Sequence, residues 1–118
     1  MTISQTMNAK PVLDRLAQNK QLPTKVAYKI YVLLSELTPT IQFFLDKRKE
    51  LFLRYGVEDG ENYVITPENQ EKFNNEFNEL LSLEYEKDIN KIDISLDIDL
   101  GISPADIFCL EAFINFIE

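Results

Sequence analysis

The chain has 118 residues, a net charge of −8 and 45% hydrophobic residues, which predicts one soluble, globular domain spanning 1–118. No apolar run is long enough to cross a bilayer, so we expect no membrane anchor. The absence of histidine and the presence of a single cysteine exclude histidine-based catalysis, an internal disulfide and the usual zinc motifs.

The charges are unevenly distributed along the chain. Residues 1–34 contain five basic residues and one acidic residue, whereas residues 35–118 contain seven basic and nineteen acidic residues. A uniformly basic surface is therefore excluded, and we do not expect nucleic acid to be a partner. A segment that could contact nucleic acid combines basic and aromatic side chains and comprises Lys20, Lys25, Tyr28, Lys29 and Tyr31, but its charges are few and dispersed.

The first predicted element is a short amphipathic helix within residues 1–20. Its apolar residues recur at helical spacing and are Met7, Val12, Leu13, Leu16 and Ala17. Because proline lacks a backbone donor and fits best in the first turn, Pro11 predicts a helix start between Thr6 and Asn8. A loop at residues 19–21 ends this helix.

Residues 22–56 form the second predicted element, a long helix that organises the rest of the chain. Its apolar residues recur at steps of three and four from Ala27 to Tyr55, and such a helix is about 45–50 Å long. Pro39 predicts a kink, because the apolar stripe crosses it in phase; a new helix starting at Pro39 is the alternative. Gly56 is expected to end the helix in a left-handed conformation.

Residues 57–66 are predicted to form a β-hairpin, since Asp59-Gly60 separates two short segments of β-forming residues. An extended loop is the alternative. Thr66 followed by Pro67 then predicts the start of a third helix, with Thr66 as its N-cap. The buried stripe of this helix is expected to be Phe73, Phe77, Leu80 and Leu81.

Residues 92–102 alternate apolar and polar side chains, which is typical of a half-buried strand. We expect this strand to pair with the 57–66 hairpin, because an isolated strand leaves its backbone groups unsatisfied. Ser103 and Asp106 have the spacing of a capping box, which predicts a C-terminal helix that extends through Ile117. The predicted fold is therefore α+β and predominantly helical, with a long kinked central helix, three shorter helices and a small antiparallel β-sheet.

The predicted C-terminal helix is apolar on nearly all sides, which indicates either a central core helix or a helix that a partner covers. The residues expected to form this interaction surface are Phe108, Phe113, Phe116 and Ile117. An acidic surface on the third helix is the alternative. It comprises Glu68, Glu71, Glu76 and Glu79, extended by Glu84, Glu86 and Asp88.

The chain offers little that suggests catalysis. The three glycines are too far apart for a phosphate-binding loop. Cys109 lies between apolar neighbours and is expected to be a small core residue. A solvent-exposed strand face explains Asp93, Asp97 and Asp99 better than a cation site does, because they lie on an extended segment. We therefore predict no catalytic, metal-binding or cofactor-binding residue and expect a non-enzymatic protein.

The resemblance of this chain to a known family lies in the order of four segments, residues 22–30, 48–56, 73–81 and 102–106. With these segments in this order, the chain resembles small acidic proteins of tailed bacteriophages and prophages, of the DUF1617 type. The resemblance covers most of the chain and implies a viral origin, a small accessory role and a location in the host cytoplasm or the virion. It carries over no activity and no functional residue.

These observations predict a phage accessory protein that acts by protein–protein interaction, as a virion or assembly component. The alternative is an inhibitor of a host protein that acts through the acidic surface. The expected partner is a phage structural protein or a host protein, with homo-oligomers as a further possibility.

Overall fold

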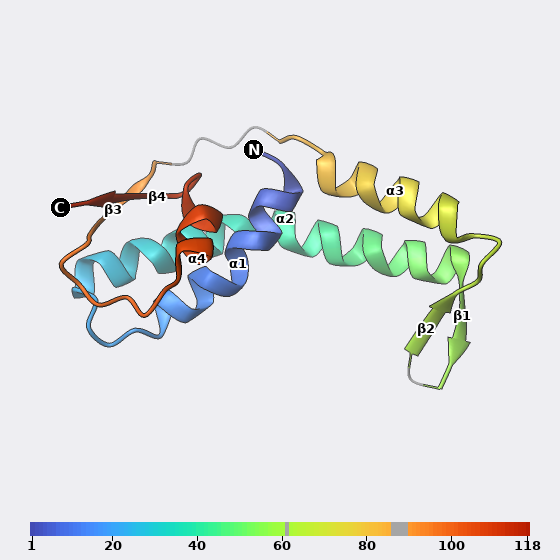
Figure 1. Cartoon of the computed structure of the whole chain (residues 1–118), viewed down its shortest axis with the longest axis horizontal. Coiled ribbons are helices and arrows are strands. Elements are labelled where there is room, and N and C mark those ends of the chain that lie inside the picture. The colour runs from blue at the N-terminus through green and yellow to red at the C-terminus, as the bar shows by residue number, and fades with distance from the viewer. Residues whose placement is uncertain (61, 86–89) are drawn as a thin grey trace.

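Figure 1 shows the computed structural model, which describes residues 1–60, 62–85 and 90–118. Its helices are α1 (Ile3–Ala17), α2 (Thr24–Tyr55), α3 (Gln70–Ser82) and α4 (Pro104–Leu110). Its strands are β1 (Gly56–Asp59), β2 (Asn62–Ile65), β3 (Ile92–Ser95) and β4 (Ile114–Ile117). The fold is α+β and mostly helical, with a small antiparallel sheet and a separate parallel pair of strands, which confirms the predicted fold class.

Helix α2 forms the axis of the molecule. Its 32 residues correspond to about 48 Å of helix, and the longest dimension of the whole protein is 52 Å. Pro39 lies inside α2 with its side chain exposed, so the prediction that one helix continues through Pro39 is confirmed. The apolar stripe of α2 is buried along both halves of the helix.

The two halves of α2 support two different hydrophobic clusters. As Figure 1 shows, α1, α4, β3 and β4 gather around its N-terminal half, whereas α3 lies along its C-terminal half, with the β1–β2 hairpin at that end. The larger cluster includes Leu13, Leu16, Ile30, Leu37, Ile94, Leu110 and Phe113, all fully buried. The smaller cluster consists of Ile3, Phe44, Leu51, Phe73 and Leu80.

The predicted start of the first helix is wrong, because α1 begins at Ile3 rather than between Thr6 and Asn8. Thr2 and Gln5 form a capping box: the amide of Gln5 donates to Thr2 Oγ1 at 3.1 Å, and the amide of Thr2 donates to Gln5 Oε1 at 2.9 Å. This cap satisfies the first amides of the helix. Pro11 therefore lies in the helix interior, where its ring is exposed to solvent.

The β-hairpin is confirmed, but both of its borders differ from the prediction. β1 and β2 are antiparallel with Asp59 opposite Asn62, and Gly60 in the turn has a φ of 66°. Gly56 is extended rather than left-handed, with a φ of −102°, because it continues directly from α2 into β1. The short antiparallel sheet thus projects from the end of the long helix (Figure 1).

Helix α3 begins at Gln70, so the predicted start at Thr66 is also wrong. The amide of Asn69 donates to the carbonyl of Thr66 at 3.0 Å, which forms a turn before the helix. The hydroxyl of Thr66 caps nothing; it is buried and has no hydrogen-bond partner among the described residues. The predicted buried stripe is nevertheless correct, since Phe73 and Leu80 are buried and Phe77 and Leu81 pack against them.

The predicted strand at residues 92–102 is too long and its predicted partner is wrong. Only β3 is extended, and it pairs in parallel with β4, with Ile92 beside Ile114. The hairpin lies at the other end of α2 and cannot reach it. After β3 the chain turns, and two side chains stabilise these turns. Ser95 Oγ accepts from the amide of Asp97 at 3.2 Å, and an Asp99 carboxylate oxygen accepts from the amide of Gly101 at 3.1 Å.

The predicted C-terminal helix is correct at its start and wrong at its end. Ser103 and Asp106 form the capping box, with the amide of Asp106 donating to Ser103 Oγ at 3.2 Å and the amide of Ser103 donating to Asp106 Oδ2 at 3.0 Å. The helix stops at Leu110, and residues 114–117 become β4. Pairing with β3 satisfies the backbone groups along one edge of each short strand, which favours an extended conformation for the apolar C-terminus. None of the helices in the described ranges is long and apolar enough to span a membrane.

Candidate interaction surface

The four residues of the predicted C-terminal surface occupy different environments. Phe113 is fully buried in the larger cluster, and Phe116 is half-buried against it. Ile117 is exposed near the end of β4. Phe108, on α4, is 73% exposed, more than any other large apolar side chain in the described part of the chain. The structure therefore assigns Phe113 to the core and leaves Phe108 as the most accessible of the four.

Helix α4 holds Phe108 on a firmly attached element. Besides the capping box at its start, Arg15 of α1 donates from Nη2 to Asp106 Oδ1 at 2.9 Å. The hydrogen bond from the backbone of Ser103, followed by the one from Arg15, lowers the pKa of Asp106, so this carboxylate stays ionised. Leu110 at the other end of α4 is fully buried. Phe108 consequently projects from a helix that is fixed at both ends.

A small hollow lies next to Phe108. It has a volume of about 130 Å³ and is lined by Gln5, Asn8, Phe108, Cys109, Glu111 and Ala112. Sites for drug-sized molecules usually measure about 300–1,000 Å³, so this hollow suits a single side chain of a partner better than a small-molecule substrate. Cys109 is half-buried at this position and packs against the larger cluster, as expected of a small structural residue.

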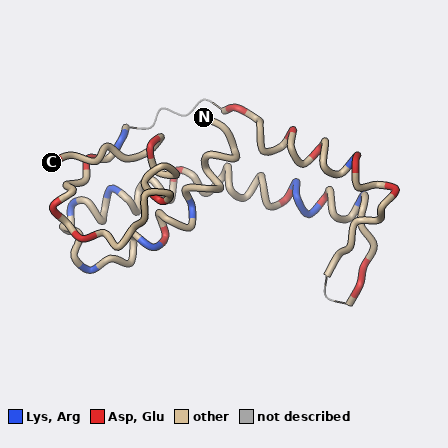
Figure 2. Tube along the Cα trace, in the orientation of Figure 1, with Lys and Arg blue, Asp and Glu red and all other residues tan. Residues whose placement is uncertain are grey.

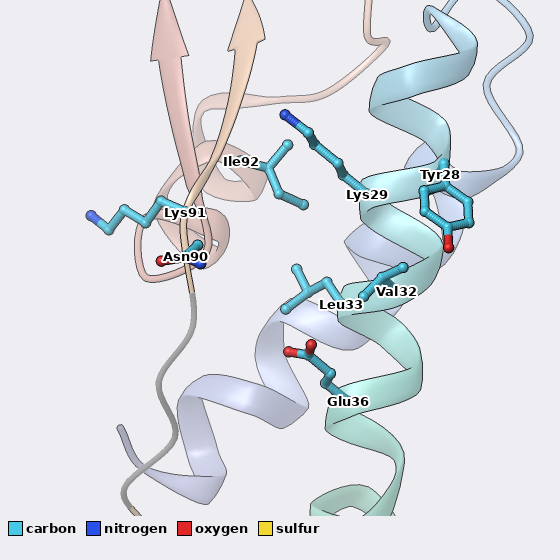
Figure 3. A pocket seen from close by; sticks show the side chains of 8 residues that line it. All are labelled: Tyr28, Lys29, Val32, Leu33, Glu36, Asn90, Lys91 and Ile92. Atoms are coloured by element: carbon cyan, nitrogen blue, oxygen red, sulfur yellow. The ribbon is translucent and has the colours of Figure 1, made fainter.

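A second hollow lies between α2 and the segment that enters β3 (Figure 3). Its volume is about 440 Å³, and its lining residues are Tyr28, Lys29, Val32, Leu33, Glu36, Asn90, Lys91 and Ile92. Tyr28 and Tyr31 are both exposed here, and their ring centroids are 6.3 Å apart. Figure 3 shows Lys29 rising from α2 toward Ile92, whereas Lys91 points away from α2. The two ammonium groups therefore do not converge on one anion.

A third hollow is a groove on the flank of the α2–α3 pair. It measures about 270 Å³, and its lining residues are Phe43, Lys47, Glu50, Leu51, Arg54, Glu76, Glu79, Leu80 and Leu83. Arg54 on α2 and Glu76 on α3 form an ion pair across it, with 3.5 Å between Nη1 and Oε2. Leu51 and Leu80 are buried, whereas Phe43 and Leu83 are exposed. The groove thus has an apolar base and charged walls.

The four glutamates of the predicted acidic surface do not share one environment. Glu68 lies in the turn before α3, and Glu71 lies in the first turn of that helix. Glu76 and Glu79 line the groove against α2, where Glu76 pairs with Arg54. Figure 2 shows this mixture as acidic segments on α3 beside basic segments on the C-terminal half of α2. Glu86 and Asp88, named with these glutamates, lie outside the described residues.

Within residues 1–60, 62–85 and 90–118, no group of three or more cysteine and acidic side chains is arranged to hold a metal ion. The aspartates near β3 make other interactions: Asn115 donates to Asp93 at 3.2 Å, and Asp99 accepts from the amide of Gly101.

Comparison with family models, with curated proteins and with solved structures found no match in any of the three. A functional proposal for this chain therefore draws on its surface geometry and on the resemblance seen in its sequence.

Proposed function

We propose that this protein is a non-enzymatic bacteriophage accessory protein, a virion or assembly component that binds another phage protein through Phe108. The observation that supports the proposal is a phenylalanine that is 73% exposed on a helix fixed by a capping box and an ion pair. The viral role rests on the sequence resemblance alone. The protein would act in the virion or in the host cytoplasm during assembly.

An exposed phenylalanine on a fixed helix has the properties of an interface anchor. Burying such a side chain contributes about 1.5–3 kcal/mol. Aromatic side chains dominate the binding energy of many interfaces, and a pre-positioned one loses little conformational freedom on binding. The hollow beside Phe108 offers a place for one side chain of the partner, so the surface combines a projection with an adjacent depression.

The alternative function, inhibition of a host protein, would use the acidic residues at the start of α3. Glu68 and Glu71 are exposed there, and the chain carries a net charge of −8. The two proposals differ in their salt dependence. Contacts between exposed charges weaken as salt rises, because the Debye length shortens, whereas burial of Phe108 is insensitive to salt.

The experiment is a pull-down with the tagged full-length chain from infected or lysogenic cells, washed at low and at high salt and analysed by mass spectrometry. We expect the wild type to recover phage capsid or tail proteins that stay bound at high salt. The Phe108→Ser variant should not recover these proteins. Leu96→Ser is the matched control, because Leu96 is also exposed but lies away from the hollow. A host protein that Phe108→Ser retains and that high salt releases would support the inhibitor instead.

A further inference from the structure

The C-terminal half of α2, residues 41–55, and α3 form a thin arm with a small core. The two helices of this arm bury one stripe against each other, and Ile3 of α1 joins their core at one end. Phe43 and Leu83 extend past the core, and each is 43% exposed. Both belong to the lining of the groove described above. A helix pair that leaves large apolar side chains along one flank has a surface that a further helix can cover.

The groove residues recur at the spacing of helix–helix contacts. On α2 they are Phe43, Lys47, Glu50, Leu51 and Arg54, and on α3 they are Glu76, Glu79, Leu80 and Leu83. Steps of three and four residues keep each set on one face of its helix. The α2 face extends over about 18 Å, which is more than three helical turns. The groove therefore matches the shape of helices that lie along it, as in a helix bundle.

The charges of the groove identify its occupant. The α2 wall carries Lys47, Glu50 and Arg54 and is net basic, whereas the α3 wall carries Glu76 and Glu79 and is acidic. Within the chain, Lys47 pairs with Glu50 at 3.1 Å and Arg54 with Glu76 at 3.5 Å. An acidic or a basic partner helix would meet like charges on one wall. A second copy of the same pair, related by a two-fold axis parallel to the helices, brings its α3 against this α2 and its α2 against this α3. Walls of opposite net charge then meet on both sides, so the surface is self-complementary, as an isologous contact requires.

We infer that a second copy of this chain binds to the groove, so that two α2–α3 arms form a four-helix bundle. Phe43 and Leu83, at the end of the groove nearest α1, become buried between the two copies, and Arg54 of each copy lies opposite Glu76 of the other. This surface is separate from Phe108, so it adds self-association to the proposed function and leaves the partner surface free.

The test is sedimentation of the purified full chain across roughly a hundredfold range of concentration. Two double variants are matched, since each removes one exposed phenylalanine and one exposed leucine: Phe43→Ser with Leu83→Ser in the arm, and Phe108→Ser with Leu96→Ser elsewhere. We expect the wild type and the second variant to dimerise with equal affinity, and the arm variant to dimerise about tenfold more weakly or not at all. Circular dichroism verifies that each variant is folded.

A charge exchange provides an independent measurement in case the arm variant unfolds. Arg54→Glu and Glu76→Arg each place like charges both within the chain, where the two residues are paired, and across the contact, so each variant alone should dimerise more weakly. Mixing the two variants brings opposite charges together only between chains, so the mixture should associate more strongly than either variant alone. A wild type that stays monomeric at every concentration would overturn the inference. A dimer that the Phe108 and Leu96 variant disrupts as strongly as the arm variant would overturn it too. Neither result affects the pull-down test of Phe108, because that experiment detects a different protein.

Discussion

Thr6 and Tyr85 are joined by a hydrogen bond between their hydroxyl groups, although they lie 79 residues apart in the sequence. Thr6 is completely buried, and its hydroxyl also donates to the carbonyl of Thr2 at 3.3 Å. Beside it, the amide of Tyr85 donates to the carbonyl of Met1 at 2.8 Å. These bonds connect α1 to the segment that leaves α3, and they attach the arm to the rest of the fold.

Tyr85→Phe should lower the free energy of unfolding by about 1 kcal/mol, the usual value of one such hydrogen bond. The loss stays modest because Thr6 keeps its bond to Thr2. Urea unfolding followed by circular dichroism measures it. Tyr28→Phe is the control, since the Tyr28 side chain is exposed. Equal stability of the two variants would contradict a structural role for the Thr6–Tyr85 bond.

Phe113→Ala should lower the free energy of unfolding by about 3–5 kcal/mol, because Phe113 is fully buried and its removal leaves a cavity. Phe108→Ala should change it by less than about 0.5 kcal/mol, because Phe108 contributes little to the core. Chemical denaturation of the two variants checks both values. Comparable losses would mean that Phe108 also packs into the fold.

Asp106→Asn should lower the melting temperature at neutral pH and have a diminishing effect in acid. The pKa of Asp106 is lowered in the folded protein, by the Ser103 backbone first and by Arg15 second. Ionisation of Asp106 therefore stabilises the fold above the unfolded pKa of 3.8, and this contribution is lost as the pH falls through the lower folded pKa. Melting curves over a pH series measure the difference between wild type and variant. A difference that persists unchanged in acid would contradict the assignment.

Pro39→Ala should raise the free energy of unfolding by about 1 kcal/mol or more, since proline is strongly unfavourable inside a helix and Pro39 is exposed. Pro104→Ala is the matched control. Pro104 lies at the start of α4, where proline is compatible with the helix, so its replacement should have little effect. Denaturant unfolding compares the two variants. If Pro39→Ala destabilises the protein, its ring must make a packing contribution that outweighs the helix penalty.

The parts of the fold that the sequence predicted correctly depend on local interactions. The long helix follows from a continuous apolar stripe, the hairpin from Asp59-Gly60, and the start of α4 from the Ser103 capping box. Each of these signals involves residues close together in the chain. The start of α1 had a similar local signal in Thr2 and Gln5, but the presence of Pro11 favoured a later start.

The C-terminal strand depends on a distant partner, and no local pattern identifies it. A short run that is apolar on all sides fits either a buried helix or a buried strand, so its own spacing does not distinguish them. Pairing of Ile114 with Ile92, 22 residues earlier, determines the extended conformation. Phe113, directly before β4, is buried, whereas Phe108 on α4 stays exposed. The four predicted interaction residues therefore do not form one surface. The groove, by contrast, could have been inferred from the sequence, because Phe43, Lys47 and Arg54 are spaced so that they lie on one face of the long helix.

The measurement that tests the central claim most directly is the affinity of the full chain for the protein that it recovers from infected cells. Isothermal titration calorimetry would compare the wild type, Phe108→Ser and the control Leu96→Ser. Loss of an anchor worth about 1.5–3 kcal/mol corresponds to a Kd about 10–150-fold higher for Phe108→Ser, with Leu96→Ser unchanged. Equal affinity of all three proteins would show that Phe108 is not the binding surface and would contradict the proposed function at this site.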